Sequence, residues 1–107
     1  MNDFESKAEA ALRQLELELR KVEELEVDLA DGILTLEFED GSKFLANSHS
    51  ASQQIWLSAN LAAWHFAWHD KTTSWRDTKS GAELFTELGK LVSDKLSQPV
   101  KLTPPRY

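Results

Sequence analysis

Acidic side chains occupy every second position in one short stretch of the sequence. Glu24, Glu26 and Asp28 alternate there with leucine and valine residues. In a β-strand, alternate side chains point to the same face and lie about 7 Å apart. The pattern therefore predicts a half-buried strand that carries a row of carboxylates on its outer face.

Three further acids adjoin or precede this strand. Glu23 comes just before it, and Glu9 and Glu16 lie two turns apart on nearly the same face of a predicted helix. Crowded carboxylates repel one another, and a multivalent cation relieves that repulsion. Oxygen ligands suit calcium, magnesium and ferric iron, and ferrous iron tolerates them. The candidate cation ligands are Glu9, Glu16, Glu23, Glu24, Glu26 and Asp28.

The alternative interpretation of these acids is a solvated surface that only keeps the protein soluble. Spacing alone brings no two carboxylates close enough to predict a tight chelate. We therefore keep both interpretations, cation binding and solubility.

A large aromatic residue is expected on the wet side of the sheet. Trp56 stands between Ile55 and Leu57, which should point into the core, and it shares the outer face with Gln54 and Ser58. An exposed tryptophan on a sheet often marks a contact surface. Partial cover by a neighbouring strand or loop is the alternative.

The histidines offer a weaker signal. His65 and His69 alternate with aromatic residues and should face outward, while His49 falls in a predicted polar loop, residues 48–52. His65 and His69 lie more than about 10 Å apart along an extended strand, so they cannot share a metal ion without a bend. A pH-sensitive contact to a partner is one interpretation of these residues, and plain surface histidines are the other.

Composition excludes several classes of function. The chain has 107 residues, a formal net charge of −6 and no cysteine. The length fits one domain, residues 1–107. Without cysteine there are no disulfides or thiolate ligands. The acidic balance argues against nucleic acid as a partner and favours cations or basic protein surfaces.

Known catalytic and targeting motifs are missing from the sequence. There is no glycine-rich phosphate loop, no Gly-x-Ser-x-Gly and no His-Glu-x-x-His. We therefore expect a binding protein rather than an enzyme with a pocket. No secretory signal and no run of membrane-spanning length are visible, which predicts a cytoplasmic protein without membrane contact.

Hydrophobic periodicity predicts two helices. Residues 3–22 carry apolar side chains at three- and four-residue spacing. Ser80 and Glu83 have the spacing of a capping box and should open the second helix, which Pro99 ends. Residues 103–107 contain two prolines and should form an extended tail.

The segment between the helices should form a sheet. Asp31-Gly32 and Asp40-Gly41 are hairpin signals, and short turns make neighbouring strands antiparallel. The predicted strands are 24–29, 33–38, 43–47, 53–58, a fifth along 64–68 and a short sixth around Trp75. The predicted fold class is α+β, a two-layer sandwich with two helices packed on one face of an antiparallel sheet of about six strands.

Several segments of the sequence resemble the frataxin family, especially its bacterial members. The most specific is Gln54-Ile55-Trp56-Leu57-Ser58, and the order and spacing of the others agree. The resemblance covers residues 3–102. The further matching segments are 31–43, Asn47, 64–66 and 75–81.

The resemblance implies an iron-binding protein that regulates iron–sulfur cluster assembly. It implies contact with a cysteine desulfurase and with the scaffold protein on which the cluster is built. It also implies weak surface binding of Fe²⁺ or Fe³⁺, with other divalent cations as alternatives, by the carboxylates of the first helix and first strand. The implied partner-binding residues are Trp56, Asn47, Gln54 and His65. We expect a monomer, with iron-dependent oligomers as the alternative.

The sequence departs from the family pattern at several positions. Leu17, Arg20 and Lys21 stand where family members commonly carry acids, and Ala67 replaces a usual aspartate. The two basic residues should weaken cation binding locally by Coulomb repulsion. We therefore expect the metal-binding edge to depend on Glu16, Glu23 and the first strand.

Three hypotheses follow from these observations. The first is an iron-dependent regulator and adaptor of desulfurase and scaffold. The second is a ferroxidase or iron chaperone that delivers or stores iron. The third is a metal-independent, acidic protein-interaction domain.

Overall fold

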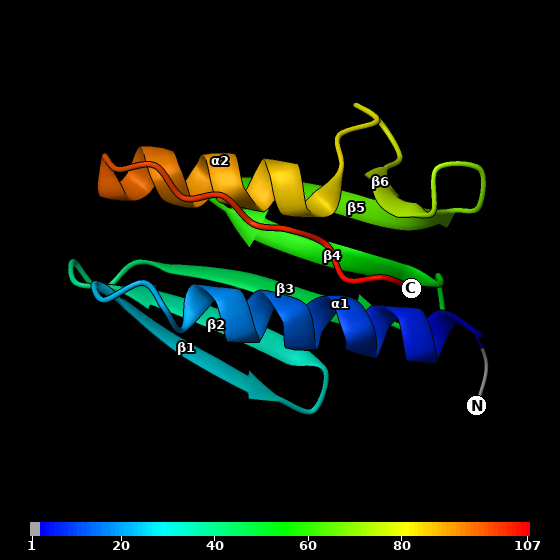
Figure 1. The fold of residues 1–107 in the computed structure, drawn as a ribbon, viewed down its shortest axis with the longest axis horizontal. Helices are drawn as coiled ribbons and strands as arrows, with labels where there is room; N and C mark the ends of the chain where they lie inside the picture. Colours follow the sequence, from blue (N-terminus) through cyan, green and yellow to red (C-terminus); the bar gives the residue numbers. More distant parts are fainter. Residues whose placement is uncertain (1–2) are drawn as a thin grey trace.

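The computed structural model describes residues 3–107 and places a six-stranded sheet behind two helices (Figure 1). All neighbouring strands are antiparallel, and their spatial order follows the chain from β1 to β6. The elements are α1 (Asp3–Leu19), β1 (Leu25–Ala30), β2 (Ile33–Phe38), β3 (Lys43–His49), β4 (Gln54–Ala59), β5 (Ala62–His69), β6 (Ser74–Asp77) and α2 (Leu84–Leu96). The predicted α+β sandwich is confirmed.

Tight turns set the register of the meander. Asp31 and Gly32 both have positive φ angles, +53° and +74°, as a two-residue hairpin turn with the twist of its strands requires. This turn pairs Ala30 with Ile33 and, four residues back along the hairpin, Glu26 with Glu37. The turn therefore decides which side chains of β1 and β2 stand opposite each other.

The core lies between the helices and the inner face of the sheet. Each helix buries the apolar side chains along one of its faces. Every strand adds inward-facing apolar side chains, because side chains alternate between the two faces of the sheet. Trp75 of β6 is fully buried and meets the rings of Phe4 and Trp68 edge to face. The buried residues of the two helices are Phe4, Ala8, Ala11, Leu12, Leu15, Leu19, Leu84, Phe85, Leu88 and Val92.

Helix boundaries differ from the sequence prediction at two places. The first helix ends at Leu19 rather than at residue 22, and residues 20–22 form a turn that leads to β1. The second helix is capped by Glu83, whose carboxylate accepts hydrogen bonds from the amides of Phe85 and Thr86. The predicted cap, Ser80, is wrong because its hydroxyl donates to Asp77 instead.

The third strand is longer than predicted. β3 continues to His49, so that the first two residues of the predicted polar loop pair with β4. Ser48 lies opposite Ile55, and His49 lies opposite Gln54. The prediction that placed His49 in a loop is therefore wrong.

The segment after α2 packs along the helices (Figure 1). Leu102 is buried, and the amide of Thr103 donates a hydrogen bond to Glu18 Oε1 of α1 at 2.7 Å. On α2, Gly89 leaves room for the backbone of Val100, because a Cβ there would lie 3.2 Å from the Val100 oxygen. Residues 100–102 thus pack on α2, and the predicted tail, residues 103–107, contains no helix or strand and is mostly exposed. Tyr107 at its end meets the ring of Trp68 edge to face.

Among residues 3–107, neither helix has the length and apolar character that crossing a membrane requires.

Leu102→Ala should destabilise the protein by about 2–3 kcal/mol, because it removes a buried leucine side chain that joins the C-terminal segment to α2. Urea unfolding followed by circular dichroism measures this change. The matched control is Leu17→Ala on the exposed face of α1, where the leucine is 62% exposed. We expect that control to change stability by less than about 0.5 kcal/mol. Equal effects of the two variants would contradict the packing role of Leu102.

Candidate functional site

The acids of β1 occupy its outer face, as the alternation predicts. Glu26 and Asp28 are exposed, whereas Leu25 is buried and Val27 is half-buried against the helices. Glu26 stands directly opposite Glu37 of β2, so two carboxylates from neighbouring strands share this face. Like charges that face each other across a ladder destabilise it unless a cation or solvent screens them.

A small acidic cleft of about 280 Å³ lies where β1 begins and β2 ends. Its wall also includes Leu25 and Phe38. We call it the hairpin-end cleft, and its carboxylates are those of Glu23, Glu24, Glu26, Glu37 and Glu39. Five acids from two strands and their flanks thus surround one hollow, which concentrates negative potential there.

Glu37 and Glu39 also line the cleft, although neither was among the predicted cation ligands. The signal that could have found them is the Asp31-Gly32 turn, since a two-residue turn fixes every pairing of the hairpin. That register places Glu26 opposite Glu37 without further information.

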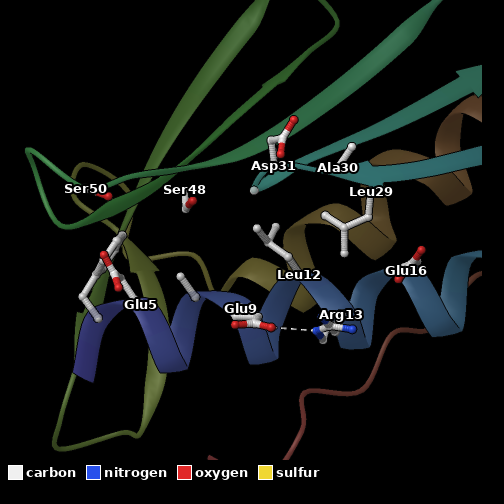
Figure 2. A pocket seen from close by; sticks show the side chains of 13 residues that line it. Glu5, Glu9, Leu12, Arg13, Glu16, Leu29, Ala30, Asp31, Ser48 and Ser50 are labelled. Carbon is white, nitrogen blue, oxygen red and sulfur yellow. Dashed lines mark hydrogen bonds and ion pairs between the residues drawn. The ribbon is translucent and has the colours of Figure 1, made fainter. Parts of the chain in front are cut away.

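The two helix acids are placed differently. Glu9 is bound by Arg13 at 2.9 Å, and Glu16 is bound by Arg20 at 2.8 Å. Both carboxylates border a second hollow, between α1 and the β1–β2 turn (Figure 2). Each arginine follows its acid by four residues, the spacing at which ion pairs form along a helix, and offsets part of the acid's charge locally.

The six predicted cation ligands therefore do not form one site. Glu23, Glu24 and Glu26 line the hairpin-end cleft, Glu9 and Glu16 border the hollow beside α1, and Asp28 lines neither. Within residues 3–107, no three histidine, aspartate or glutamate side chains are arranged to coordinate one metal ion.

Trp56 lies on the outer face of the sheet between two histidines. Its ring stacks on His49 of β3, with centroids 3.9 Å apart, and on His65 of β5, with centroids 4.7 Å apart. The indole N–H donates a hydrogen bond to Gln54 Oε1 at 2.8 Å. These contacts hold a half-buried tryptophan in one orientation and leave its edge at the surface.

The residues predicted to bind partners come together around this tryptophan. Asn47 and His65 are its direct cross-strand neighbours, and Gln54 is its hydrogen-bond partner. His49 was missed as a member because it was expected in a loop. We call this group the tryptophan face, and it consists of Asn47, His49, Gln54, Trp56 and His65.

Asp77 supports the tryptophan face from the edge of the sheet. Its buried carboxylate accepts hydrogen bonds from the amides of His65 and Ser80 at 2.9 Å, and from the Lys79 amide at 3.2 Å. Burial alone would raise the pKa of Asp77, but together with the Ser80 hydroxyl these donors bring the pKa below its ordinary value. The ionised carboxylate thus ties β5 to the turn after β6.

A family model and the named relatives of this chain point to the same protein family. A model of the frataxin-like domain matches residues 1–98. A protein of Dechloromonas aromatica named iron-sulfur cluster assembly protein CyaY is 36% identical over 103 residues, which is 94% of this chain and 96% of that protein. A protein of Paraburkholderia phymatum with the same name is 32% identical over 104 residues, 96% of this chain and 97% of that protein.

Two solved structures are similar to the fold. The frataxin of Psychromonas ingrahamii has a TM-score of 0.86 and 26% identity, and the match covers 96% of this chain and 99% of that one. Yeast frataxin has a TM-score of 0.70 and 24% identity, over 88% of this chain and 80% of that one. The second likeness concerns the fold alone.

Asp77→Asn should destabilise the protein at neutral pH by about 1 kcal/mol or more, because charged acceptors form the stronger hydrogen bonds. A lowered folded-state pKa stabilises the fold above the unfolded-state pKa, which is about 3.9, and this stabilisation is lost as pH falls through the folded-state value. The stability difference between wild type and variant should therefore shrink below about pH 4. Urea unfolding at a series of pH values measures it, and a difference independent of pH would contradict the charged role.

Proposed function

The chain belongs to the frataxin-like family, and we propose that it serves iron–sulfur cluster assembly as an iron-responsive adaptor between a cysteine desulfurase and the scaffold protein. Relatives named for cluster assembly match nearly the whole chain at 32% and 36% identity. The observation that carries the proposal is the presence of two different surfaces on one sheet, an acidic cleft and a fixed tryptophan.

Weak iron binding is assigned to the hairpin-end cleft. Five carboxylates border it, and Glu26 faces Glu37 across the strand pair. Oxygen-only ligands match ferric iron and are tolerated by ferrous iron, and surface carboxylates that share no closed coordination shell bind such cations weakly. Glu9 and Glu16 of α1 contribute less to iron binding than the cleft acids do, because Arg13 and Arg20 already pair with them.

Partner binding is assigned to both surfaces. The acidic cleft suits a basic patch on the desulfurase, since complementary charge speeds encounter and fixes orientation. The tryptophan face suits the scaffold, because a rigid aromatic anchor whose rotamer is already fixed loses little entropy on binding. Trp56 is held by two stacked rings and one hydrogen bond before any partner arrives.

A ferroxidase is the enzyme alternative, in which the same carboxylates would oxidise ferrous iron. Oxygen consumption on addition of ferrous iron separates it from plain binding. A metal-independent interaction domain is the other alternative. In that case partner binding would not change when iron is removed by a chelator.

Ferrous iron should bind first at the hairpin-end cleft. In an anaerobic NMR titration, we expect paramagnetic broadening to be strongest for residues 23–26 and 37–39. The double variant Glu26→Gln/Glu37→Gln should weaken affinity by about fivefold or more, since each lost charge removes on the order of 1 kcal/mol of attraction in water.

The matched control is Glu9→Gln, whose carboxylate is already paired with Arg13. This control should leave iron affinity within about twofold of wild type. Broadening that avoids the cleft, or equal losses in both variants, would contradict the assignment.

Trp56→Ala should weaken binding to the scaffold by about tenfold or more, because central tryptophans commonly contribute 2 kcal/mol or more to an interface. Isothermal titration with the purified scaffold measures it. The control is Leu61→Ala, at a fully exposed turn position outside the tryptophan face. Unchanged affinity of the Trp56 variant would remove the anchor role.

A further inference from the structure

A hollow of about 520 Å³ lies at the edge of the sheet where β5 and β6 pair. Ala67 and Arg76 are direct partners across this strand pair, and the short alanine side chain leaves space beside the arginine. Arg76 stands on the outer face, because its neighbour Trp75 points into the core. Thr78 lines the same hollow. We call it the arginine hollow.

Hydrogen bonds hold the half-buried guanidinium of Arg76 in place. Its Nε donates to Ser74 Oγ at 2.9 Å, and its Nη1 donates to the carbonyl oxygen of Gly81 at 3.3 Å. Ser74 Oγ is itself bonded to Thr72 Oγ1 at 2.6 Å, which His69 Nδ1 contacts at 3.1 Å. Among residues 3–107, no hydrogen-bond partner engages Nη2 of Arg76. A guanidinium that is held on one side and open on the other loses little entropy when it binds a ligand.

The charge of Arg76 has no carboxylate partner within the described part of the chain. Asp77 is the only acid of residues 3–107 that lines the arginine hollow, and its carboxylate already accepts hydrogen bonds from three backbone amides. Glu83, which forms a β-bridge with Arg76, uses its carboxylate to cap α2. The exposed Lys71 and Lys79, on the turns at either end of β6, belong to none of the ion pairs found in residues 3–107. The two acids are thus engaged within the fold, whereas the three cations are not.

The arginine hollow suits a carboxylate group. Guanidinium N–H groups match carboxylate oxygens in geometry and form charge-assisted hydrogen bonds with them. Thr78 adds an exposed hydroxyl that can donate a further hydrogen bond. A metal cation or a basic side chain would instead meet the positive charge of Arg76.

The position of the arginine hollow indicates which molecule carries the carboxylate. Ala67 pairs with Arg76 on one side and with Gln54 of the tryptophan face on the other. Arg76 therefore lies two strands, or about 10 Å, from Gln54. An interface of ordinary size, with about 800 Å² on each partner, would cover both. A protein that binds the tryptophan face thus also reaches the arginine hollow.

We propose that the arginine hollow receives an aspartate or glutamate side chain of the protein that docks on the tryptophan face. The carboxylate binds the open side of the Arg76 guanidinium. This inference rests on the proposed function for the identity of the partner, and it names the chemistry of that partner at one point of the interface. It is independent of iron binding, because the hairpin-end cleft lies on β1 and β2 at the other edge of the sheet.

The first test uses a short Gly-Ser peptide that carries three glutamates, with a glutamine peptide as the matched control. We expect saturable NMR shifts of the Ala67 and Thr78 amides with the glutamate peptide only. Arg76→Gln should abolish these shifts. Lys90→Gln makes the same change of net charge at an exposed position of α2, and it should leave peptide affinity within about twofold of wild type.

The second test blocks the arginine from within the protein. Ala67→Asp places a carboxylate directly across the strand pair from Arg76, where opposite charges attract. It should weaken binding of the purified scaffold by about fivefold or more, because the guanidinium is then engaged before the partner arrives. Ala67→Asn is the matched control, with nearly the same size and no charge, and it should stay within about twofold of wild type. Urea unfolding checks that both variants fold.

Several results would overturn the proposal. Equal shifts with the glutamate and glutamine peptides, or equal losses in Ala67→Asp and Ala67→Asn, would mean that no carboxylate is recognised. Scaffold binding that Ala67→Asp leaves unchanged would refute it as well. Inorganic phosphate that shifts the two amides when the glutamate peptide does not would assign the hollow to a free oxyanion. A scaffold that does not bind the wild-type protein would refute the proposed function, and the peptide titration then decides the carboxylate site by itself.

Discussion

The hairpin of β1 and β2 is the constraint on which the candidate site depends. Its core face must bury Leu25, Leu34 and Leu36 under α1, and its Asp31-Gly32 turn allows one register. Once both conditions hold, the acids of β1 and β2 have no other place than the outer face and the open end of the hairpin. Charge crowding there is therefore a consequence of how the core packs.

The fold divides its charge between two regions with different character. Beside α1, Arg13 and Arg20 pair with Glu9 and Glu16, so the negative charge there is partly compensated. At the hairpin-end cleft, five carboxylates gather around a small hollow. The second arrangement, whose carboxylates are less compensated, suits a hydrated cation or a basic surface.

Much of this arrangement could be predicted from the sequence, because alternation and helical periodicity decide which faces are buried. The outer positions of Glu26 and Trp56 followed from their buried neighbours alone. The stacking of His49 on Trp56 could not be predicted in this way, because the polar residues at the end of β3 do not indicate where the strand ends. The capping of α2 by Glu83 could not be predicted either, because the Ser80 hydroxyl donates its hydrogen bond to the buried Asp77 and does not cap the helix. Such contacts depend on tertiary packing that local patterns do not encode.

Cluster assembly in vitro tests the central claim most directly. The rate of iron–sulfur cluster formation on the scaffold would be measured with desulfurase, cysteine and ferrous iron, with and without this protein. We predict that wild-type protein changes the rate in proportion to its concentration, and that a variant combining Trp56→Ala with Glu26→Gln and Glu37→Gln does not. A rate that is the same with and without the wild-type protein would contradict the proposed function.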